Sequence, residues 1–170
     1  PIFIMLAILI KAGSKGPIIY KQERIGLNGL PFFIYKFRSM HIGSEKNGPQ
    51  LSSKNDQRIT PIGKIMRKSR LDETPQFFNV IKGDMAIIGP RPERQYYIEK
   101  IIERAPHYKH IKKVKPGITS WGQVKYGYAE NVDQMIDRLK FDLLYVENMS
   151  LILDFKILFY TFIIMLKGTG

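Results

Sequence analysis

The two ends of the chain are its most apolar segments, and they limit how it can fold. Residues 1–10 read PIFIMLAILI and carry no charge before Lys11. A helix of that length reaches about 15 Å, roughly half of the hydrocarbon core of a bilayer, so this segment cannot span a membrane alone. KAGSKGP follows it, without the cleavage site of a signal peptide. Two interpretations stay open, a helix that dips into a membrane interface and a helix buried in the core.

The C-terminal segment is apolar as well. Residues 151–167 read LILDFKILFYTFIIMLK, with Asp154 and Lys156 as the charges that precede Lys167. The uncharged run 157–166 is long enough for a helix in a membrane interface and marginal for one that spans a membrane. We therefore expect an apolar C-terminal helix.

Composition indicates one domain with anionic partners. With 170 residues, 44% of them hydrophobic, the chain can bury one sizeable core, so we expect a single domain over residues 1–170. The net charge of +12 favours nucleic acid, acidic lipid headgroups or phosphorylated substrates. The absence of cysteine excludes disulfides, thiolate metal sites and cysteine nucleophiles, and three histidines suit zinc chemistry poorly. Because the chain starts at Pro1, we expect it to be the C-terminal part of a longer chain.

A β-hairpin is predicted over residues 17–39, where an Asn-Gly pair separates two runs rich in β-forming residues. In its second strand Lys36 and Arg38 are two residues apart and share a face. That basic face is either a solvated surface or part of a binding site. The polar segment 43–60 predicts a mobile surface loop that could close over a substrate.

Helical spacing and turn residues predict the remaining elements. A short basic helix covers residues 62–70, and Thr74-Pro75, as N-cap and first helical residue, opens a helix that runs to about Ile81. MAIIG (85–89) predicts a buried strand, and a further helix covers 93–104 before Pro106. A last helix is predicted from an apolar stripe typical of a core face: Val132, Met135, Ile136, Leu139, Leu143 and Val146.

The stretch 67–94 concentrates the residues suited to chemistry. Asp72 and Glu73 are adjacent carboxylates at the mouth of a helix, and such a pair can share Mg²⁺, which prefers oxygen ligands and substrate phosphates. The simpler alternative is that they stabilise the start of that helix through its dipole. Arg91 stands between Pro90 and Pro92, which hold its backbone so that its guanidinium can present a fork to a phosphate.

Four motifs resemble, in order, those of the bacterial sugar transferases, which are monotopic polyprenyl-phosphate phosphoglycosyl transferases. They are KFRSM (36–40), LDETPQFFNVIKGDM (71–85), IGPRPE (88–93) and KPGITS (115–120). RLKFDLLYVENMSLILDFKIL (138–158) is similar to the C-terminal region of that family. The resemblance covers almost the whole chain. Asn79 and Gly83 also match family positions, where capping and turn formation are the expected roles.

The resemblance implies an α+β fold: a compact, mostly helical, membrane-associated domain with a small β-hairpin or sheet. It also implies an N-terminal re-entrant helix, with Pro1 at its bend and its incoming half missing from this chain, and an apolar C-terminal helix. The expected location is the bacterial inner (cytoplasmic) membrane, with the catalytic domain facing the cytoplasm. Membrane lipid is then a partner, nucleic acid is not, and a homo-oligomer stays open.

The family mechanism implies that Asp72 attacks the sugar-bearing phosphorus of a UDP-sugar and releases UMP. The acceptor, polyprenyl (undecaprenyl) phosphate, then attacks the phosphosugar-aspartate intermediate, a two-step exchange with ping-pong kinetics. Glu73 is expected to hold Mg²⁺ together with Asp72. The expected phosphate-binding residues are the cations Lys36, Arg38, Arg67 and Arg91.

The sequence departs from the family pattern over residues 119–128, where Tyr128 stands at a position often held by arginine. Gln123 matches, and we expect it to contact substrate. Trp121 and Tyr126 could stack on a uracil or sugar ring, although packing is the more common role of such aromatic residues.

Two other functions compete with the transferase. One is a basic nucleic-acid-binding module, and the other is an inactive membrane scaffold in which Asp72 and Glu73 are dispensable.

Overall fold

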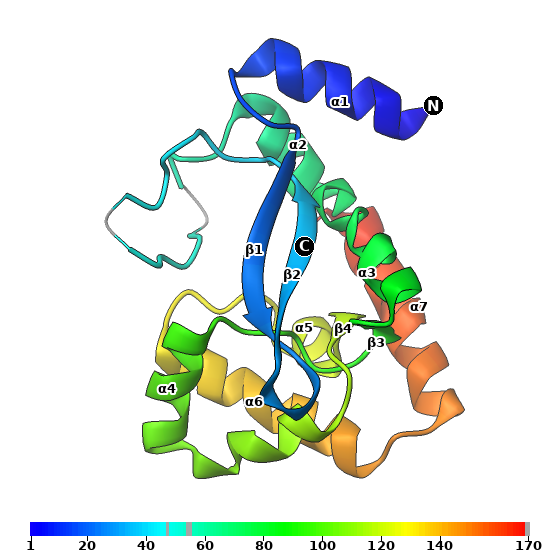
Figure 1. Ribbon diagram of the computed structural model, residues 1–170. Helices are drawn as coiled ribbons and strands as arrows, with labels where there is room; N and C mark the ends of the chain where they lie inside the picture. The colour runs from blue at the N-terminus through cyan, green and yellow to red at the C-terminus, as the bar shows by residue number, and fades with distance from the viewer. Residues whose placement is uncertain (47, 54–55, 169–170) are drawn as a thin grey trace.

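The computed structural model describes residues 1–46, 48–53 and 56–168 and has an α+β fold. Its first elements, in Figure 1, are α1 (Ile2–Gly13), β1 (Ile19–Ile25), η1 (Leu27–Gly29), β2 (Pro31–Phe37), α2 (Pro61–Lys68), η2 (Leu71–Glu73) and α3 (Gln76–Lys82). They are followed by β3 (Ala86–Ile88), α4 (Gln95–Arg104), η3 (Pro106–Lys113), β4 (Gly117–Thr119), α5 (Trp121–Lys125), α6 (Val132–Glu147) and α7 (Leu151–Lys167).

The predicted hairpin is confirmed. β1 and β2 pair antiparallel from Ile19 opposite Phe37 to Ile25 opposite Pro31. Asn28 (φ 56°) and Gly29 (φ 76°) both take the left-handed conformation in the turn between them, which explains why an Asn-Gly pair suits it. The hairpin crosses the molecule as a long ribbon, with α1 and α2 near one end and α4 and α6 near the other (Figure 1).

A second, smaller sheet pairs β3 with β4 in parallel, with Ala86 opposite Gly117 and Ile88 opposite Thr119. The strand predicted within MAIIG is confirmed, but the prediction that it is buried is wrong. Ile87 is 46% exposed, and the buried side chain is that of Met85, just before the strand. A Cβ at Gly117 would lie 2.1 Å from the amide nitrogen of Gly89, so the two backbones come together only because both residues are glycine.

The helix predicted to run to about Ile81 is confirmed as α3, but the N-cap predicted at Thr74 is wrong, and another Thr-Pro pair, Thr60-Pro61, opens α2 in that way. Thr60 is the N-cap of α2, and its side chain accepts a hydrogen bond from the amide of Gly63, 3.0 Å away. Thr74 has helical φ and ψ and donates its hydroxyl to the carbonyl of Leu71, because η2 runs directly into α3. The predicted turn after α3 is confirmed by Gly83, its left-handed C-cap.

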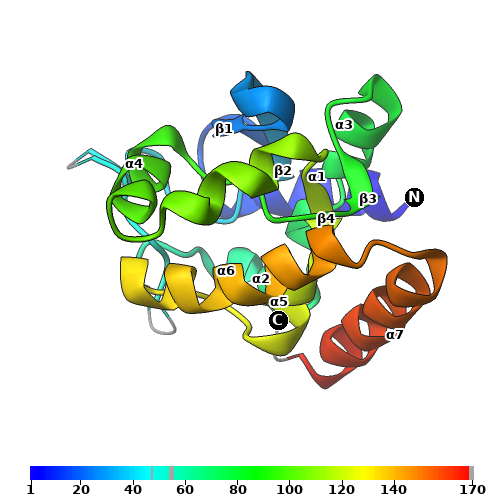
Figure 2. The same cartoon turned by 90° about the horizontal axis from the view of Figure 1, so that it is seen from below.

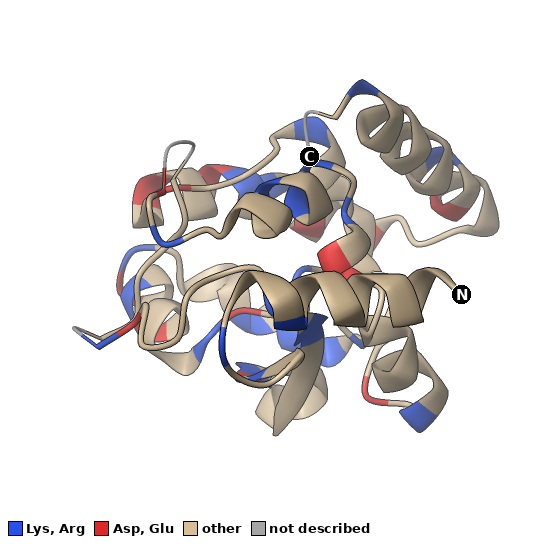
Figure 3. Ribbon diagram, turned by 90° about the horizontal axis from the view of Figure 1, so that it is seen from above, with Lys and Arg blue, Asp and Glu red and all other residues tan. Residues whose placement is uncertain are grey.

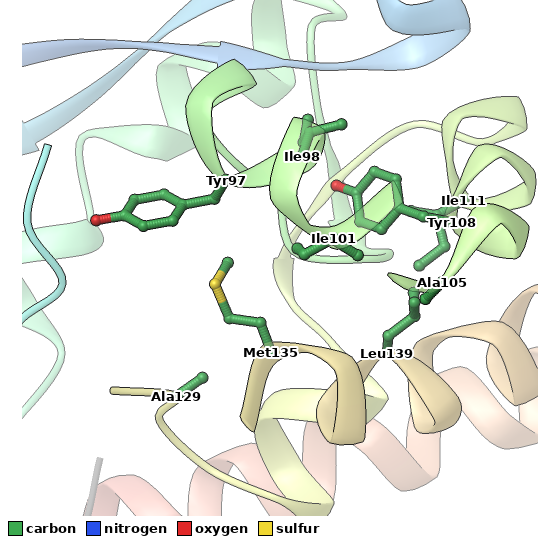
Figure 4. Close-up of a cluster of buried hydrophobic side chains, with 9 residues drawn as sticks. All are labelled: Tyr97, Ile98, Ile101, Ala105, Tyr108, Ile111, Ala129, Met135 and Leu139. Carbon is green, nitrogen blue, oxygen red and sulfur yellow. The ribbon is translucent and has the colours of Figure 1, made fainter. Parts of the chain in front are cut away.

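The main core lies between α4, η3 and α6, which the view from below shows packed against one another (Figure 2). Figure 4 shows its buried side chains, which are Tyr97, Ile98, Ile101, Ala105, Tyr108, Ile111, Ala129, Met135 and Leu139. The predicted stripe on the last core helix is confirmed in part. Met135 and Leu139 are buried, whereas Val132, Ile136 and Leu143 are partly buried against the same cluster. The helix predicted over 93–104 corresponds to α4.

The apolar ends both form helices with one face against the protein. α1 buries Leu6 and Ile10 against Phe37 and Met66, and α7 buries Ile157. Their other faces are exposed, and Figure 3 shows both ribbons with few charged positions.

No helix within the described part of the chain is both long enough and apolar enough to cross a bilayer. The loop predicted over 43–60 forms turns in its described part, and residues 47, 54 and 55 lie outside the described residues.

Candidate active site

The Asp72-Glu73 pair lies in η2, at the bend between α2 and α3. Arg70 begins this bend in the left-handed conformation (φ 56°), which is strained for any residue with a Cβ. The bend turns both carboxylates inward, so Asp72 is 7% exposed and Glu73 is 5% exposed. Neither caps α3, whose N-cap is Pro75 without a side-chain hydrogen bond. The pair therefore does not cap α3 by hydrogen bonds, and the interaction with the helix dipole stays a prediction.

Glu73 is surrounded by three cations. Its Oε1 accepts hydrogen bonds from Nζ of Lys36 at 2.6 Å and from Nη2 of Arg91 at 3.2 Å. Nη1 of Arg70 lies 3.5 Å from its Oε2. Burial by itself raises the pKa of Glu73, but the charges of these three cations hold it well below its usual range. The Glu73 carboxylate is therefore ionised and its charge is neutralised by the protein.

Asp72 has the opposite environment. No hydrogen bond or ion pair from a described residue reaches its carboxylate. Burial, followed by the negative charge of Glu73, raises its pKa, and the more distant cations Lys36, Arg67 and Arg70 offset this only in part. Two adjacent carboxylates thus differ, one saturated by cations and the other free to react or to bind a metal. Such an asymmetric pair is typical of acid, base and nucleophile sites.

Lys36 and Arg91 come to Glu73 from β2 and from the loop before α4. Burial lowers the pKa of Lys36, more than the neighbouring carboxylate of Glu73 raises it. For Arg91, burial is the largest single cause and lowers the pKa, but the neighbouring acidic groups, Glu73 first among them, together outweigh it and the net shift is upward. The predicted basic strand face is therefore not a solvated surface, because the Lys36 side chain is 17% exposed and paired with Glu73.

The carboxylate pair opens into a cavity of about 590 Å³, within the size range of small-ligand sites. Six of the seven predicted site residues line it: Lys36, Arg38, Arg67, Asp72, Glu73 and Arg91. They come from segments far apart in the sequence, and the fold brings them to one place. A cavity with one free carboxylate and several cations suits a substrate with a diphosphate.

Two of these cations already hold other groups. Arg67 donates from Nε to Oγ of Ser39 at 2.9 Å and from Nη1 to Oγ of Ser52 at 2.6 Å. Arg38 is 6% exposed and donates to the carbonyls of Ser14, at 2.9 Å, and of Lys15. Arg38 therefore ties the end of α1 to the hairpin. For both arginines, the phosphate-binding role stays a prediction.

Gln123 lies apart from the cavity. It is 4% exposed in α5, and within the described structure its Oε1 has no hydrogen-bond partner. Its predicted contact with substrate stays a prediction. Trp121 packs against Tyr160 of α7, with ring centroids 6.2 Å apart, in agreement with the packing role. Neither Trp121 nor Tyr126 is among the residues that line the cavity.

Sequence reasoning missed further charged residues of the same cavity wall, which are Glu93, Arg24 and Arg138. Glu93, two residues after Arg91, pairs with Arg24 of β1 and with Arg138 of α6. Asp142 of α6 accepts hydrogen bonds from the amide of Gly122, at 2.8 Å, and from the backbone of Arg91. The available signal was the placement of Arg138 and Asp142 on the core side of α6, since charges at core positions need buried partners.

The donor set fits a hard divalent cation with few protein ligands. In residues 1–46, 48–53 and 56–168, no three His, Asp or Glu side chains come together as metal ligands. The two carboxylates are hard oxygen ligands, of which Asp72 is free and Glu73 is engaged mainly at Oε1. Mg²⁺ commonly binds through one or two carboxylates together with substrate phosphates, so the residues fit that ion.

Comparisons with known proteins identify the family of the chain. The family model described as "Bacterial sugar transferase" matches residues 1–168. The chain is 44% identical, over all of its length and 40% of the relative's, to the UDP-N-acetylgalactosamine-undecaprenyl-phosphate N-acetylgalactosaminephosphotransferase of Aeromonas hydrophila. It is 40% identical, over 95% of its length and 35% of the relative's, to the UDP-glucose:undecaprenyl-phosphate glucose-1-phosphate transferase of Klebsiella pneumoniae. The chain thus spans less than half of these relatives, and it belongs to the bacterial sugar transferase family.

Proposed function

We propose that the chain is the catalytic part of an enzyme that transfers a sugar 1-phosphate from a UDP-sugar to polyprenyl (undecaprenyl) phosphate. The observation that carries the proposal is the free, buried Asp72 carboxylate beside a cation-saturated Glu73 in a cavity of about 590 Å³. The names of the relatives supply the substrate classes, since they include UDP-sugars and undecaprenyl phosphate.

In the first step, an Asp72 oxygen attacks the phosphorus that bears the sugar. The bond between that phosphorus and the bridging oxygen breaks, and UMP leaves with the electron pair. The sugar phosphate is then linked to Asp72 through a carboxyl–phosphate mixed anhydride. Within the described residues no side chain pairs with the Asp72 carboxylate, which suits this role because its oxygens stay open to the phosphorus of a substrate.

In the second step, an oxygen of the acceptor phosphate attacks the same phosphorus, and Asp72 leaves as a carboxylate. The product is polyprenyl diphosphosugar. Lys36 and Arg91 keep positive charge beside the reacting phosphate, while Glu73 fixes both cations in place. Asp72 and Glu73 are the carboxylates that would hold Mg²⁺, which would supply positive charge for the diphosphate oxygens.

We further propose that the domain contacts a membrane, where the polyprenyl acceptor resides. In both Figures 1 and 2, α7, α3 and the N-terminal end of α1 lie on the same side of the molecule. Large apolar side chains are exposed on each of these helices, among them Ile4, Ile8, Phe77, Phe78, Ile81, Leu151, Ile152, Phe155, Phe159, Phe162 and Leu166. Such a surface is suited to the membrane interface. The expected setting is the cytoplasmic face of the bacterial inner membrane, with α1 as the outgoing half of a re-entrant helix.

The test is UMP release by the full-length protein in membranes from a panel of UDP-sugars, with and without polyprenyl phosphate and Mg²⁺. We expect release from at least one donor that depends on acceptor and Mg²⁺, and its loss in Asp72→Asn. Asp137→Asn removes an exposed carboxylate of α6 and serves as the control, which should keep full activity. UMP release that persists in Asp72→Asn would contradict the role of Asp72. The absence of UMP release with every donor would contradict the proposed function and favour an inactive scaffold.

A further inference from the structure

Tyr128 is one of the aromatic residues that line the cavity, and its environment suits contact with a substrate. It lies in the segment between α5 and α6, directly after Gly127, whose φ of +92° turns the chain there. Tyr128 lines the cavity together with Asp72 and Glu73 and is 46% exposed. A half-exposed ring beside the carboxylate pair has room to meet a substrate.

Arg70 holds this ring in place. Its guanidinium lies 5.3 Å from the centroid of the Tyr128 ring, within the range of a cation–π contact. Arg70 is itself fixed by its strained backbone and by the ion pair with Glu73. The Arg70 side chain is 11% exposed and is not part of the cavity wall. Of Arg70 and Tyr128, it is therefore Tyr128 that a ligand in the cavity can contact.

The phenol hydroxyl of Tyr128 is available to a ligand. It makes no hydrogen bond to any residue that the structure describes. Burial raises the pKa of Tyr128, and charges act on it in both directions, with Glu73 and Asp72 raising it and Arg70 and Arg91 lowering it. The hydroxyl is therefore a neutral donor and acceptor near the carboxylate pair.

Chemistry favours the sugar over the phosphates as the group that meets Tyr128. The phosphates have charged partners in the cavity, among them Lys36 and Arg91. The wall also contains Tyr20 and Tyr97, but the Tyr20 hydroxyl is hydrogen-bonded to Gln22 and Glu45, and Tyr97 is buried. A phenol gives a sugar both an apolar ring face and a hydroxyl that pairs with its hydroxyl groups. In the proposed reaction, the sugar is attached to the phosphorus that Asp72 attacks. The sugar must therefore lie close to the Asp72 and Glu73 carboxylates.

We propose that Tyr128 binds the sugar of the donor and helps to determine which UDP-sugar is used, with Arg70 as the residue that positions the ring. This inference rests on the proposed function and goes beyond it by assigning a sugar-binding residue. The loss of one neutral hydrogen bond corresponds to about a 3- to 10-fold weaker interaction. The expected effect is therefore on KM and donor preference more than on kcat.

The experiment compares wild type, Tyr128→Phe, Arg70→Lys and Tyr126→Phe in the full-length protein in membranes. UMP release is measured with UDP-N-acetylgalactosamine and UDP-glucose, and UMP is used as a product inhibitor. Tyr128→Phe should raise KM for the preferred donor about 3- to 10-fold and change the ratio of kcat/KM between donors. Inhibition by UMP, which has no sugar to transfer, should stay unchanged. Arg70→Lys should shift the same ratio, since lysine keeps the charge but not the planar contact.

Tyr126→Phe is the matched control, because Tyr126 is two residues away, 38% exposed and outside the cavity wall. Its kinetics should match the wild type. A Tyr128→Phe protein with wild-type KM and donor ratio, or one that changes UMP inhibition by the same factor as KM, would overturn the sugar assignment. A wild type that releases no UMP from any donor would instead overturn the proposed function, and this inference with it.

Discussion

Nζ of Lys36 lies 2.6 Å from Oε1 of Glu73, and this contact joins the hairpin to the bend that carries both carboxylates. Both side chains are largely buried, at 17% and 6% exposure. Arg91 donates to the same oxygen, so one carboxylate fixes two cations beside the free Asp72.

Lys36→Met should destabilise the protein. The variant leaves the buried Glu73 carboxylate without its shortest contact, while Arg91 and Arg70 still neutralise part of its charge. We expect a loss of about 1–3 kcal/mol in the free energy of unfolding, measured by urea denaturation. Lys21→Met removes a charge from an exposed position of the neighbouring strand and should change stability by less than about 0.5 kcal/mol. Equal losses in the two variants would contradict the importance of the Lys36–Glu73 pair.

Asp72→Asn should be at least as stable as the wild type at neutral pH, although it is expected to be inactive. The raised pKa of Asp72 means that burial and Glu73 disfavour its ionised form, and asparagine removes that charge with little change in shape. Residues kept for reaction at a cost in stability behave in this way. The measurement is the urea midpoint of the metal-free protein. A variant that is clearly less stable than wild type would mean that Asp72 has a structural role instead.

Asp142→Ala should weaken the support of Arg91. It removes the acceptor of the Gly122 amide and of the Arg91 backbone, and it leaves buried donors without partners. We expect a loss of about 2–4 kcal/mol in urea denaturation, with a smaller loss for Asp142→Asn, which keeps one acceptor oxygen. Glu147→Ala, an exposed carboxylate change on the same helix, is the control. The prediction fails if Asp142→Ala and Glu147→Ala unfold at the same urea concentration.

Asp56 should make stability depend on pH in the acid range. Its carboxylate accepts hydrogen bonds from Nε of Arg58 at 2.8 Å and from Oγ of Ser52 at 3.2 Å. The hydrogen bond from the Arg58 side chain is the main cause that lowers the pKa of Asp56 from 3.8 to about 2. A lowered pKa stabilises the folded state above the unfolded value of 3.8, and this contribution is lost as the pH falls from there toward 2.

Asp56→Asn should therefore be less stable than wild type at pH 7, and the difference should narrow as the pH falls through this window. The measurement is urea denaturation of both proteins at pH 7 and near pH 3. Asp137→Asn, which changes an exposed pair with Lys140, should show little difference at either pH. A difference in the free energy of unfolding between wild type and Asp56→Asn that is the same at both pH values would mean that ionisation of the carboxylate does not stabilise the folded state.

Local sequence signals predicted the elements that local interactions decide. The Asn-Gly turn predicted the hairpin, helical spacing predicted α4 and α6, and Gly83 ended α3 where expected. The carboxylate pair and most of its surrounding cations were also predicted, through motifs whose residues the fold then brought around one cavity. The helices, the hairpin and the turns depend on backbone preferences and periodicity over a few neighbouring residues, whereas the site residues were predicted from the resemblance to a family.

Tertiary structure alone decided which partners the charged groups have. Lys36 and Arg38 look equivalent along one strand face, yet Lys36 binds Glu73, 37 residues away, and Arg38 binds the carbonyls at the end of α1. Asp72 and Glu73 are neighbours, yet the pKa of one is raised and that of the other is lowered. The physical reason is that desolvation and ion pairing depend on distances between groups remote in the sequence, which the chain sets only when it folds.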